Sequence, residues 1–286
     1  MPFFRCLLFV PAGDERKLEK ALHLEVDGLI LDLEDAVGPS RKTKAREMAC
    51  QTLKEHPGRF FVRVNPATSD YFLGDILSLA GAPAAGLVLA KTESAAHVDR
   101  VDWLLGLLER ERGLDVGGTE IVPFIESARA LEDARAIATA SKRVRRLFFG
   151  GNDYAADIGV EYGGGAFWYA RSRLAAVSRA AGLEPPVDTV NPDFRDLSAL
   201  ADDAAQARVL GFQGKMAIHP AQVEVIRRVF TPTAEEVEKA QKVVAAFEAA
   251  VQNGSVLAGV DGKMVEAPHV QRARNILSTG NPGHKS

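Results

Sequence analysis

Short apolar runs alternate along the chain with amphipathic segments, at intervals of roughly thirty residues. Buried strands that alternate with helices in this way are typical of a parallel sheet. Eight such repeats favour an α/β fold, a closed (β/α)8 TIM barrel, with an open doubly wound sheet as the alternative. The expected strands cover residues 6–11, 27–33, 59–65, 85–91, 120–126, 145–151, 186–191 and 215–220, of which the seventh has the weakest pattern.

The last part of the chain exceeds what a barrel requires. Thr233 is followed three residues later by Glu236, which is the signature of a capping box at the start of a helix. A further helical segment follows near the C-terminus. We therefore predict a TIM-barrel catalytic domain over residues 1–230 and a C-terminal helical extension over residues 231–286, which forms an arm or lid.

The composition changes this picture little, since 47% hydrophobic and 26% charged residues are usual for a globular protein. A net charge of -3 and a pI near 6.1 provide no overall attraction to nucleic acid or to anionic membranes. No apolar stretch approaches the roughly 20 residues of a membrane span. We therefore expect that the protein binds neither nucleic acid nor membranes. Cys6 and Cys50 lack disulfide or zinc-ligand spacing, which favours reduced thiols and a cytoplasmic protein.

Polar residues follow the ends of the expected strands, where TIM-barrel enzymes carry out their chemistry. They are Asp32, Glu34, Asp35, Arg63, Asn65, Lys91, Glu93, Glu126, Asp153, Asp188, Asn191 and His219. Acids outnumber bases in this set, so their convergence would leave a pocket of excess negative charge. A divalent cation would relieve that charge, and oxygen ligands without nearby cysteine or clustered histidine favour Mg2+ or Mn2+ over zinc.

Eight motifs run in order through nearly the whole chain. They are LFVPAGDERKLEKA (8–21), LILDLEDAVGPSRKTKAR (29–46), VRVN (62–65), AKTES (90–94), PFIESARAL (123–131), FFGGNDYAADIG (148–159), GKMAIHPAQV (214–223) and GKMVEAPHVQRA (262–273). Each motif is weak alone, but together they resemble the CitE-like lyases of the HpcH/HpaI aldolase family. That family comprises the citrate lyase β subunit and the malyl-CoA and citramalyl-CoA lyases.

The resemblance implies a Mg2+-dependent lyase that cleaves or forms a 3-hydroxyacyl-CoA thioester such as malyl-CoA or citramalyl-CoA. The products of cleavage would be acetyl-CoA and a 2-oxo acid. Glu126 and Asp153 match the family's Mg2+ ligands, and Mn2+ is a possible substitute. Asp157 is the rival for the second ligand, although helix capping or loop structure suits it better. Arg63 would stabilise the oxyanion that develops on the thioester side.

Basic residues in three motifs match the family's positions for binding the CoA arm. They are Arg16, Lys42 and Arg46, whose charges suit phosphate groups. His219 has two open interpretations: an acid–base group, or a residue that caps its loop before Pro220.

The three carboxylates of LILDLEDAV cannot all bind one ion. Alternation along a strand places Asp32 and Glu34 on one face and Asp35 on the other face or in the loop. With Glu126 and Asp153 as ligands, we expect this group to accept hydrogen bonds from metal-bound waters and from neighbouring Arg or Lys residues. Glu34 and Asp35 are its principal candidates.

The sequence departs from the family at two positions. Ala90 replaces a common proline, and Glu266 replaces the aspartate of the GKMxD motif. In the family that acid enters a neighbouring subunit's active site, which implies a homo-oligomer, a trimer or hexamer. Glutamate is one methylene longer, and misplacement on the ångström scale can lower a rate by about a hundredfold. Two alternatives therefore stay open: a citryl-carrier lyase β subunit that needs partner subunits, or a non-catalytic CoA-ester binding protein.

Overall fold

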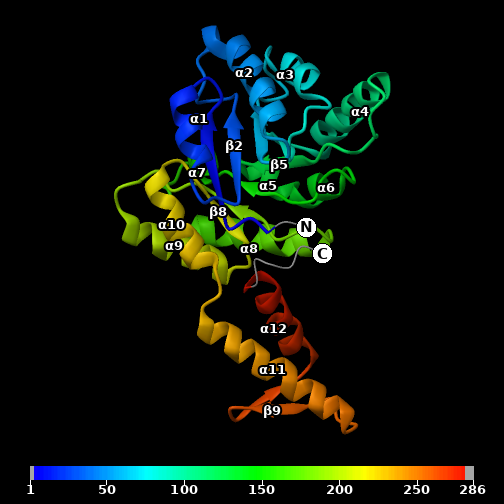
Figure 1. Cartoon of the computed structure of the whole chain (residues 1–286), viewed down its shortest axis with the longest axis vertical. Helices are drawn as coiled ribbons and strands as arrows, with labels where there is room; N and C mark the ends of the chain where they lie inside the picture. The colour runs from blue at the N-terminus through cyan, green and yellow to red at the C-terminus, as the bar shows by residue number, and fades with distance from the viewer. Residues whose placement is uncertain (1–2, 281–286) are drawn as a thin grey trace. The chain divides into compact units, whose positions relative to one another are not determined.

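The computed structural model describes residues 3–280, and these contain the predicted closed barrel. Eight parallel strands pair in chain order, and β8 closes the ring by pairing with β1. Figure 1 shows the whole chain, coloured from the N-terminus to the C-terminus. The strands are β1 Cys6–Pro11, β2 Gly28–Asp32, β3 Phe60–Val64, β4 Gly86–Leu89, β5 Ile121–Ile125, β6 Phe148–Phe149, β7 Val187–Asp188 and β8 Gly214–Ala217. The TIM barrel is thus confirmed, and the open sheet is wrong.

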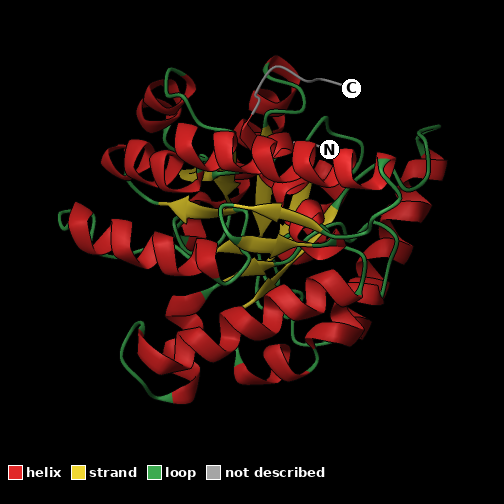
Figure 2. Ribbon diagram, turned by 90° about the horizontal axis from the view of Figure 1, so that it is seen from below, coloured by secondary structure: helices red, strands yellow, loops and turns green. Residues whose placement is uncertain are grey.

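Helices surround the strands on the outside of the barrel, as Figure 2 shows. This arrangement buries the strands on both faces, which explains why β2 and β3 are apolar runs without alternation. The helices of the barrel are α1 Glu15–Leu22, α2 Lys42–Glu55, α3 Phe72–Leu79, α4 Ala95–Glu111, α5 Ala128–Glu132, α6 Ala134–Thr139, α7 Gly151–Ile158, α8 Gly164–Ala180, α9 Leu197–Val209 and α10 Pro220–Phe230.

The interior of the barrel is a packed apolar core, and aromatic rings fill much of it. Phe61 lies edge-on to Phe4 and to Phe148, with centroid distances of 5.3 and 5.8 Å. Phe124 contacts Phe148 in the same manner at 6.2 Å. Because apolar side chains fill the interior, we expect the candidate site at the ends of the strands.

A cluster of buried charges fastens the barrel to its helices. Lys215 of β8 lies 2.6 Å from Asp188 of β7 and 2.7 Å from Asp203 of α9, while Arg171 of α8 pairs with both acids. Asp188, one of the polar residues expected at a strand end, therefore faces the helix layer. Its role is structural because its charge is matched within the cluster.

The contacts divide the chain into two compact units, and the boundary along the chain lies between Arg227 and Arg228. In the second unit α11 (Ala234–Gln252) packs against α12 (Ala267–Gly280). The capping box is confirmed, since the Thr233 hydroxyl accepts the Glu236 N–H and the Glu236 carboxylate accepts the Thr233 N–H.

A β-hairpin accompanies the two helices of the second unit, whereas the sequence had predicted helices alone. It consists of β9 (Ala258–Val260) and β10 (Lys263–Val265). Asp261 and Gly262 join the strands with φ values of 49° and 72°. Asp-Gly between apolar residues is a strong signal for such a turn. No helix within residues 3–280 is both long and apolar enough to cross a membrane.

Candidate active site

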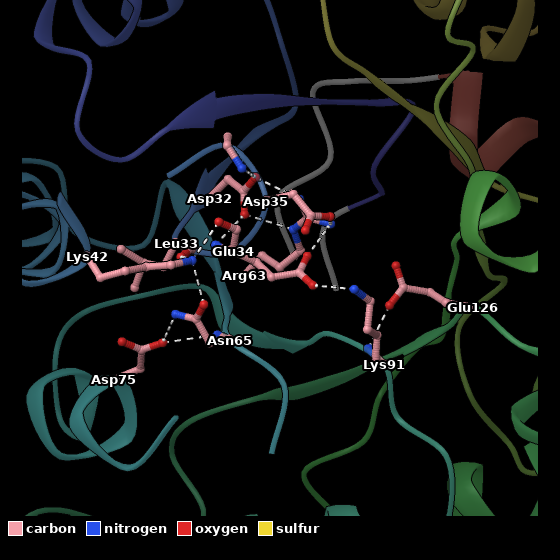
Figure 3. A network of polar contacts seen from close by, with 11 residues as sticks. Asp32, Leu33, Glu34, Asp35, Lys42, Arg63, Asn65, Asp75, Lys91 and Glu126 are labelled. Carbon is pink, nitrogen blue, oxygen red and sulfur yellow. Dashed lines mark hydrogen bonds and ion pairs between the residues drawn. The ribbon is translucent and has the colours of Figure 1, made fainter. Parts of the chain in front are cut away.

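Arg63 lies at the C-terminal end of β3 and is held by a carboxylate from the adjacent strand (Figure 3). Its Nε and Nη2 donate to the two oxygens of Asp32 at 2.8 and 2.7 Å. Asp32 also accepts the backbone N–H groups of Glu34 and Ala36, at 2.9 and 3.2 Å. This two-point contact fixes the plane of the guanidinium, 5.0 Å from the centre of the Phe9 ring.

Glu34 is buried between two cations in the loop after β2. Its carboxylate lies 2.9 Å from Nη1 of Arg63 and 3.1 Å from Nζ of Lys91. Burial raises the pKa of Glu34, Arg63 opposes that effect, and the nearby charge of Asp35 adds to it. Glu34 thus contacts an Arg and a Lys, the kinds of neighbour expected for it, through ion pairs.

Asp35 contributes less than expected. Its side chain is 61% exposed and lies 3.8 Å from Arg63, whereas Asp32 holds the same guanidinium at two points. The chain turns away from the barrel after Glu34, so Asp35 points toward solvent. Asp32, which was expected to be less important than Glu34 and Asp35, is the main carboxylate partner of Arg63.

Glu126 follows β5 and is 3% exposed. One carboxylate oxygen, Oε2, accepts the backbone N–H of Lys91 at 2.6 Å, and Oε1 accepts no hydrogen bond from residues 3–280. Gly150 packs directly on this side chain, since a β-carbon there would lie 2.3 Å from Cγ of Glu126. Burial raises the pKa of Glu126 to about 8, although the Lys91 N–H and the charge of Arg63 act in the opposite direction.

Asp153 lies in the first turn of α7 and is half-buried. Its charge contributes to the raised pKa of Glu126, so the two carboxylates interact electrostatically. Its carboxylate makes no hydrogen bond or ion pair with the described part of the chain. Two carboxylates with unpaired oxygens, one of them buried, form an electrostatically unfavourable pair that a cation would relieve.

This donor set fits Mg2+. Among residues 3–280 no group of three or more His, Cys, Asp or Glu side chains is arranged to hold a metal ion. Mg2+ typically takes one or two protein carboxylates and keeps waters or substrate oxygens at its other positions. Glu126 and Asp153 suffice for that mode, with Glu126 offering one oxygen.

Two of the open interpretations are decided by hydrogen bonds. Asp157 accepts the Ala128 N–H at 2.8 Å, so it caps α5 as expected. His219 is exposed, accepts the Ala221 N–H at 3.2 Å, and stacks on Phe194 with a centroid distance of 4.8 Å. These contacts match the loop-capping interpretation of His219.

The basic residues expected to hold the CoA arm lie in different surroundings. Lys42 is buried, and its Nζ donates to the carbonyls of Leu33 and Glu34 at 2.7 Å and to Oδ1 of Asn65 at 2.6 Å. All three of its donors are thus used, and no donor is left for a phosphate.

Arg46 is also engaged inside the protein, since its Nε donates to Asp75 at 2.8 Å. Asp75 also accepts hydrogen bonds from the backbone N–H and the side-chain amide of Asn65. Asn65 in turn accepts from Lys42, so these contacts link Arg46 to Lys42. We therefore interpret Lys42 and Arg46 as residues that brace the β2 and β3 loops. Arg16 differs, because it is exposed on α1 and its guanidinium has no partner among residues 3–280.

A cavity of about 400 Å³ lies beside the site, between β1, α1 and the loop after β8. Asp32 lies in its wall, so the cavity adjoins the carboxylate that holds Arg63. Its remaining lining combines apolar side chains with basic ones from α1; the lining includes Leu8, Val10, Lys17, Lys20, Ala21 and Ile218.

Glu266 belongs to the second unit, directly before α12. Its backbone carbonyl accepts the N–H groups of His269 and Val270, and its N–H donates to Nδ1 of His269. Its half-buried carboxylate makes no hydrogen bond or ion pair with the described residues.

Two residues of the site, Lys91 and Gly150, have roles in the structure that the sequence pattern did not predict. Lys91 stood among the strand-end bases without a role, and its contact with Glu126 comes from the backbone, which a side-chain pattern does not reveal. Gly150 belongs to the Gly-Gly pair of FFGGND, and paired glycines after a strand do indicate a close approach of the backbone.

A closed (β/α)8 barrel with carboxylates and an arginine at the C-terminal strand ends defines a TIM-barrel enzyme. The model of the HpcH/HpaI aldolase/citrate lyase family matches residues 5–220, and a model of carbon–carbon bond lyases of the TIM-barrel fold matches residues 174–281. The chain therefore belongs to the HpcH/HpaI aldolase/citrate lyase family, whose members include lyases of carbon–carbon bonds.

The similarity to individual relatives covers nearly the whole chain. Citrate lyase subunit beta of Haemophilus influenzae is 32% identical over 289 residues, which cover 99% of each chain. A (3S)-malyl-CoA thioesterase of Cereibacter sphaeroides is 36% identical and covers 96% of this chain and 94% of its own. The structure of CitE from Mycobacterium tuberculosis with magnesium, acetoacetate and coenzyme A is similar with a TM-score of 0.79, 27% identity, and 97% and 98% coverage.

Proposed function

We propose that the protein is a Mg2+-dependent lyase that cleaves, or in reverse forms, a 3-hydroxyacyl-CoA such as malyl-CoA or citramalyl-CoA. The products of cleavage are acetyl-CoA and a 2-oxo acid. One observation carries the proposal: the unpaired carboxylate oxygens of Glu126 and Asp153 lie at the same barrel mouth as a fixed guanidinium, that of Arg63. The CitE structure with magnesium and coenzyme A supports both the ion and the thioester.

Glu126 and Asp153 would hold the ion, which when bound supplies Lewis-acid polarisation of the 2-oxo acid oxygen. The guanidinium of Arg63 donates two of its five N–H groups to Asp32, and its Nη1 forms an ion pair with Glu34. The remaining donors would stabilise the negative charge that develops on the thioester oxygen when the carbon–carbon bond breaks. Asp32 keeps them aimed, because its two-point contact prevents rotation of the guanidinium.

The substrate's CoA arm needs cations outside the barrel mouth. Arg16 is the one member of the expected set whose guanidinium is exposed and without a partner in the described chain, so we keep it as the phosphate-binding residue. Glu266 would supply an acid to a neighbouring subunit of a homotrimer or homohexamer. Cys6 and Cys50 are both free thiols, which agrees with a cytoplasmic location.

A condensation screen tests the reaction. Purified protein is incubated with Mg2+, acetyl-CoA or propionyl-CoA, and glyoxylate or pyruvate, and mass spectrometry detects the condensed thioester. Glu126→Gln should abolish the Mg2+-dependent product without loss of the fold. Asp157→Asn is the matched control, because it alters an acid of the same region whose oxygen caps α5. Equal turnover in Glu126→Gln and wild type would contradict the metal assignment.

A second candidate function is hydrolysis of the thioester. The relative named (3S)-malyl-CoA thioesterase favours it, as does Glu266, which is one methylene longer than the aspartate of the lyase motif. Release of thiol separates the two reactions, since cleavage of malyl-CoA leaves CoA acylated and hydrolysis produces free CoA. Thiol release with malate as the other product would identify a hydrolase.

A third candidate, a citryl-carrier lyase β subunit, is favoured by the relative from Haemophilus influenzae. In that case the purified chain alone would form no product with any pair of substrates. Addition of an acyl-carrier partner would then be required for activity.

A further inference from the structure

Lys91 has a backbone conformation that lysine rarely adopts. Its φ is 50°, in the left-handed region, and among residues 3–280 the other non-glycine residue with positive φ is Asp261, at 49°. Asp261 occupies a hairpin turn that demands this geometry, whereas Lys91 follows β4 at the barrel mouth. Glycine would adopt the conformation without strain. A strained lysine at such a place calls for a function of both its backbone and its side chain.

The backbone of Lys91 orients Glu126. The left-handed turn aims the Lys91 N–H at Oε2 of Glu126, at 2.6 Å (Figure 3). Gly150 closes the other side of the same carboxylate, since a β-carbon at that position would lie 2.8 Å from Oε1. Glu126 is therefore held between two stretches of main chain, with one oxygen left to bind an ion.

The side chain of Lys91 restrains Glu34. Its ammonium lies 3.1 Å from Oε1 of Glu34 and is 42% exposed, and Arg63 lies 2.9 Å from the other oxygen. Neither oxygen of Glu34 has a hydrogen bond of good geometry, so these two ion pairs alone fix the carboxylate. Lys91 therefore contacts both acids, Glu34 through its ammonium and Glu126 through its N–H. Without the ammonium, only the ion pair with Arg63 would hold Glu34, and its other oxygen could turn toward a cation bound by Glu126.

We propose that Lys91 is a positioning residue with two separable parts. Its N–H presents a single oxygen of Glu126 to Mg2+, and its ammonium keeps Glu34 out of the ion's coordination sphere. This inference rests on the proposed function in taking Glu126 as a Mg2+ ligand. A third carboxylate would suit Ca2+, which takes six to eight oxygens, better than Mg2+, which keeps several waters. Lys91 thereby determines the choice of metal.

The test is a calorimetric titration of full-length protein with Mg2+ or Ca2+, without substrate. Lys91→Gly keeps the N–H and the backbone conformation but removes the ammonium. We expect its Mg2+ affinity to stay within about threefold of wild type and its Ca2+ affinity to rise about tenfold or more. Lys91→Arg should restore the wild-type preference, and Glu34→Gln added to Lys91→Gly should abolish the gain in Ca2+ affinity.

Asp261→Gly is the matched control, because it relieves the same strain far along the chain. Asp261→Gly should melt at or above the wild-type temperature and keep wild-type affinities for both ions. Wild-type affinities in Lys91→Gly would overturn the role of the ammonium, and a large loss of Mg2+ affinity would overturn the separation of the two parts. A wild-type protein that binds neither ion would instead contradict the metal site itself.

Discussion

Gly150 shows at the scale of one residue how the backbone shapes the proposed metal site. A β-carbon at this position would lie 2.3 Å from Cγ of Glu126, so Gly150→Ala must displace that side chain. We expect Mg2+ affinity to fall at least about tenfold, because ligand geometry governs Mg2+ binding. Isothermal titration measures it. Gly165→Ala is the control, since a β-carbon there meets nothing within 4 Å, and equal affinities in both variants would contradict the prediction.

Asp32 should act on turnover and not on metal binding. Asp32→Asn keeps the size of the side chain but removes the charge that holds Arg63 at two points. A misaligned guanidinium loses most of its oxyanion stabilisation, so we expect kcat to fall about a hundredfold. The Mg2+ affinity of the variant should stay within about threefold of wild type. A parallel loss of metal binding would show that Asp32 supports the whole site and not Arg63 alone.

The residue types at the strand ends were enough to predict which residues form the site, but they did not reveal the role of each residue. Arg63 and Glu34 are adjacent because neighbouring parallel strands end at one edge of the barrel. Lys42 and Arg46 have the charge that phosphate requires, yet both point into the protein, toward carbonyls and Asp75. A positive charge on a helix does not reveal which way its side chain points. The backbone contact of Lys91 leaves no trace in residue type at all.

At the scale of elements, strand length explains where the sequence was informative. β1 to β5 have four to six residues, and their apolar runs stand out. β6 and β7 have two residues each, so the surrounding loops dilute their pattern. The hairpin of β9 and β10 was missed because its strands have three residues each, although its Asp-Gly turn was visible.

A buried ion pair between Glu109 and Arg143 helps to join α4 to the segment before β6, which makes stability sensitive to acid. Glu109 of α4 accepts hydrogen bonds from both terminal nitrogens of Arg143 and from the Gly117 N–H. Burial alone would raise the pKa of Glu109, but these contacts outweigh it and lower the pKa to about 2. Because the folded-state pKa lies below the unfolded value, the contribution is present above about pH 4.5 and is lost toward pH 2.

Glu109→Gln should therefore lower the free energy of unfolding by about 2 to 3 kcal/mol at pH 7 and by less near pH 3. Urea denaturation at a series of pH values measures the difference. Glu111→Gln, an exposed acid two residues further along α4, is the control. An equal loss at pH 7 and pH 3 would point to altered packing and not to ionisation.

At the scale of the whole molecule, Glu266 and Arg63 belong to different compact units. The resemblance to the CitE-like lyases implies that the acid of this motif enters a neighbouring subunit's active site. Such a site would need two subunits. The unpaired carboxylate of Glu266 agrees with such a role. A mixture of two inactive variants tests it directly, without any need to divide the chain.

Arg63→Ala removes the oxyanion donor of a subunit's own barrel, and Glu266→Gln removes the acid that it lends. Each variant alone should have little activity. If each site combines one barrel with one borrowed acid, equal mixing after subunit exchange should restore both groups in about a quarter of the sites. Refolded mixtures assayed for thioester cleavage should then recover about a quarter of wild-type turnover. A mixture that stays inactive would mean that Arg63 and Glu266 serve the same subunit's site, whereas an active Glu266→Gln variant on its own would mean that Glu266 takes no part in the reaction.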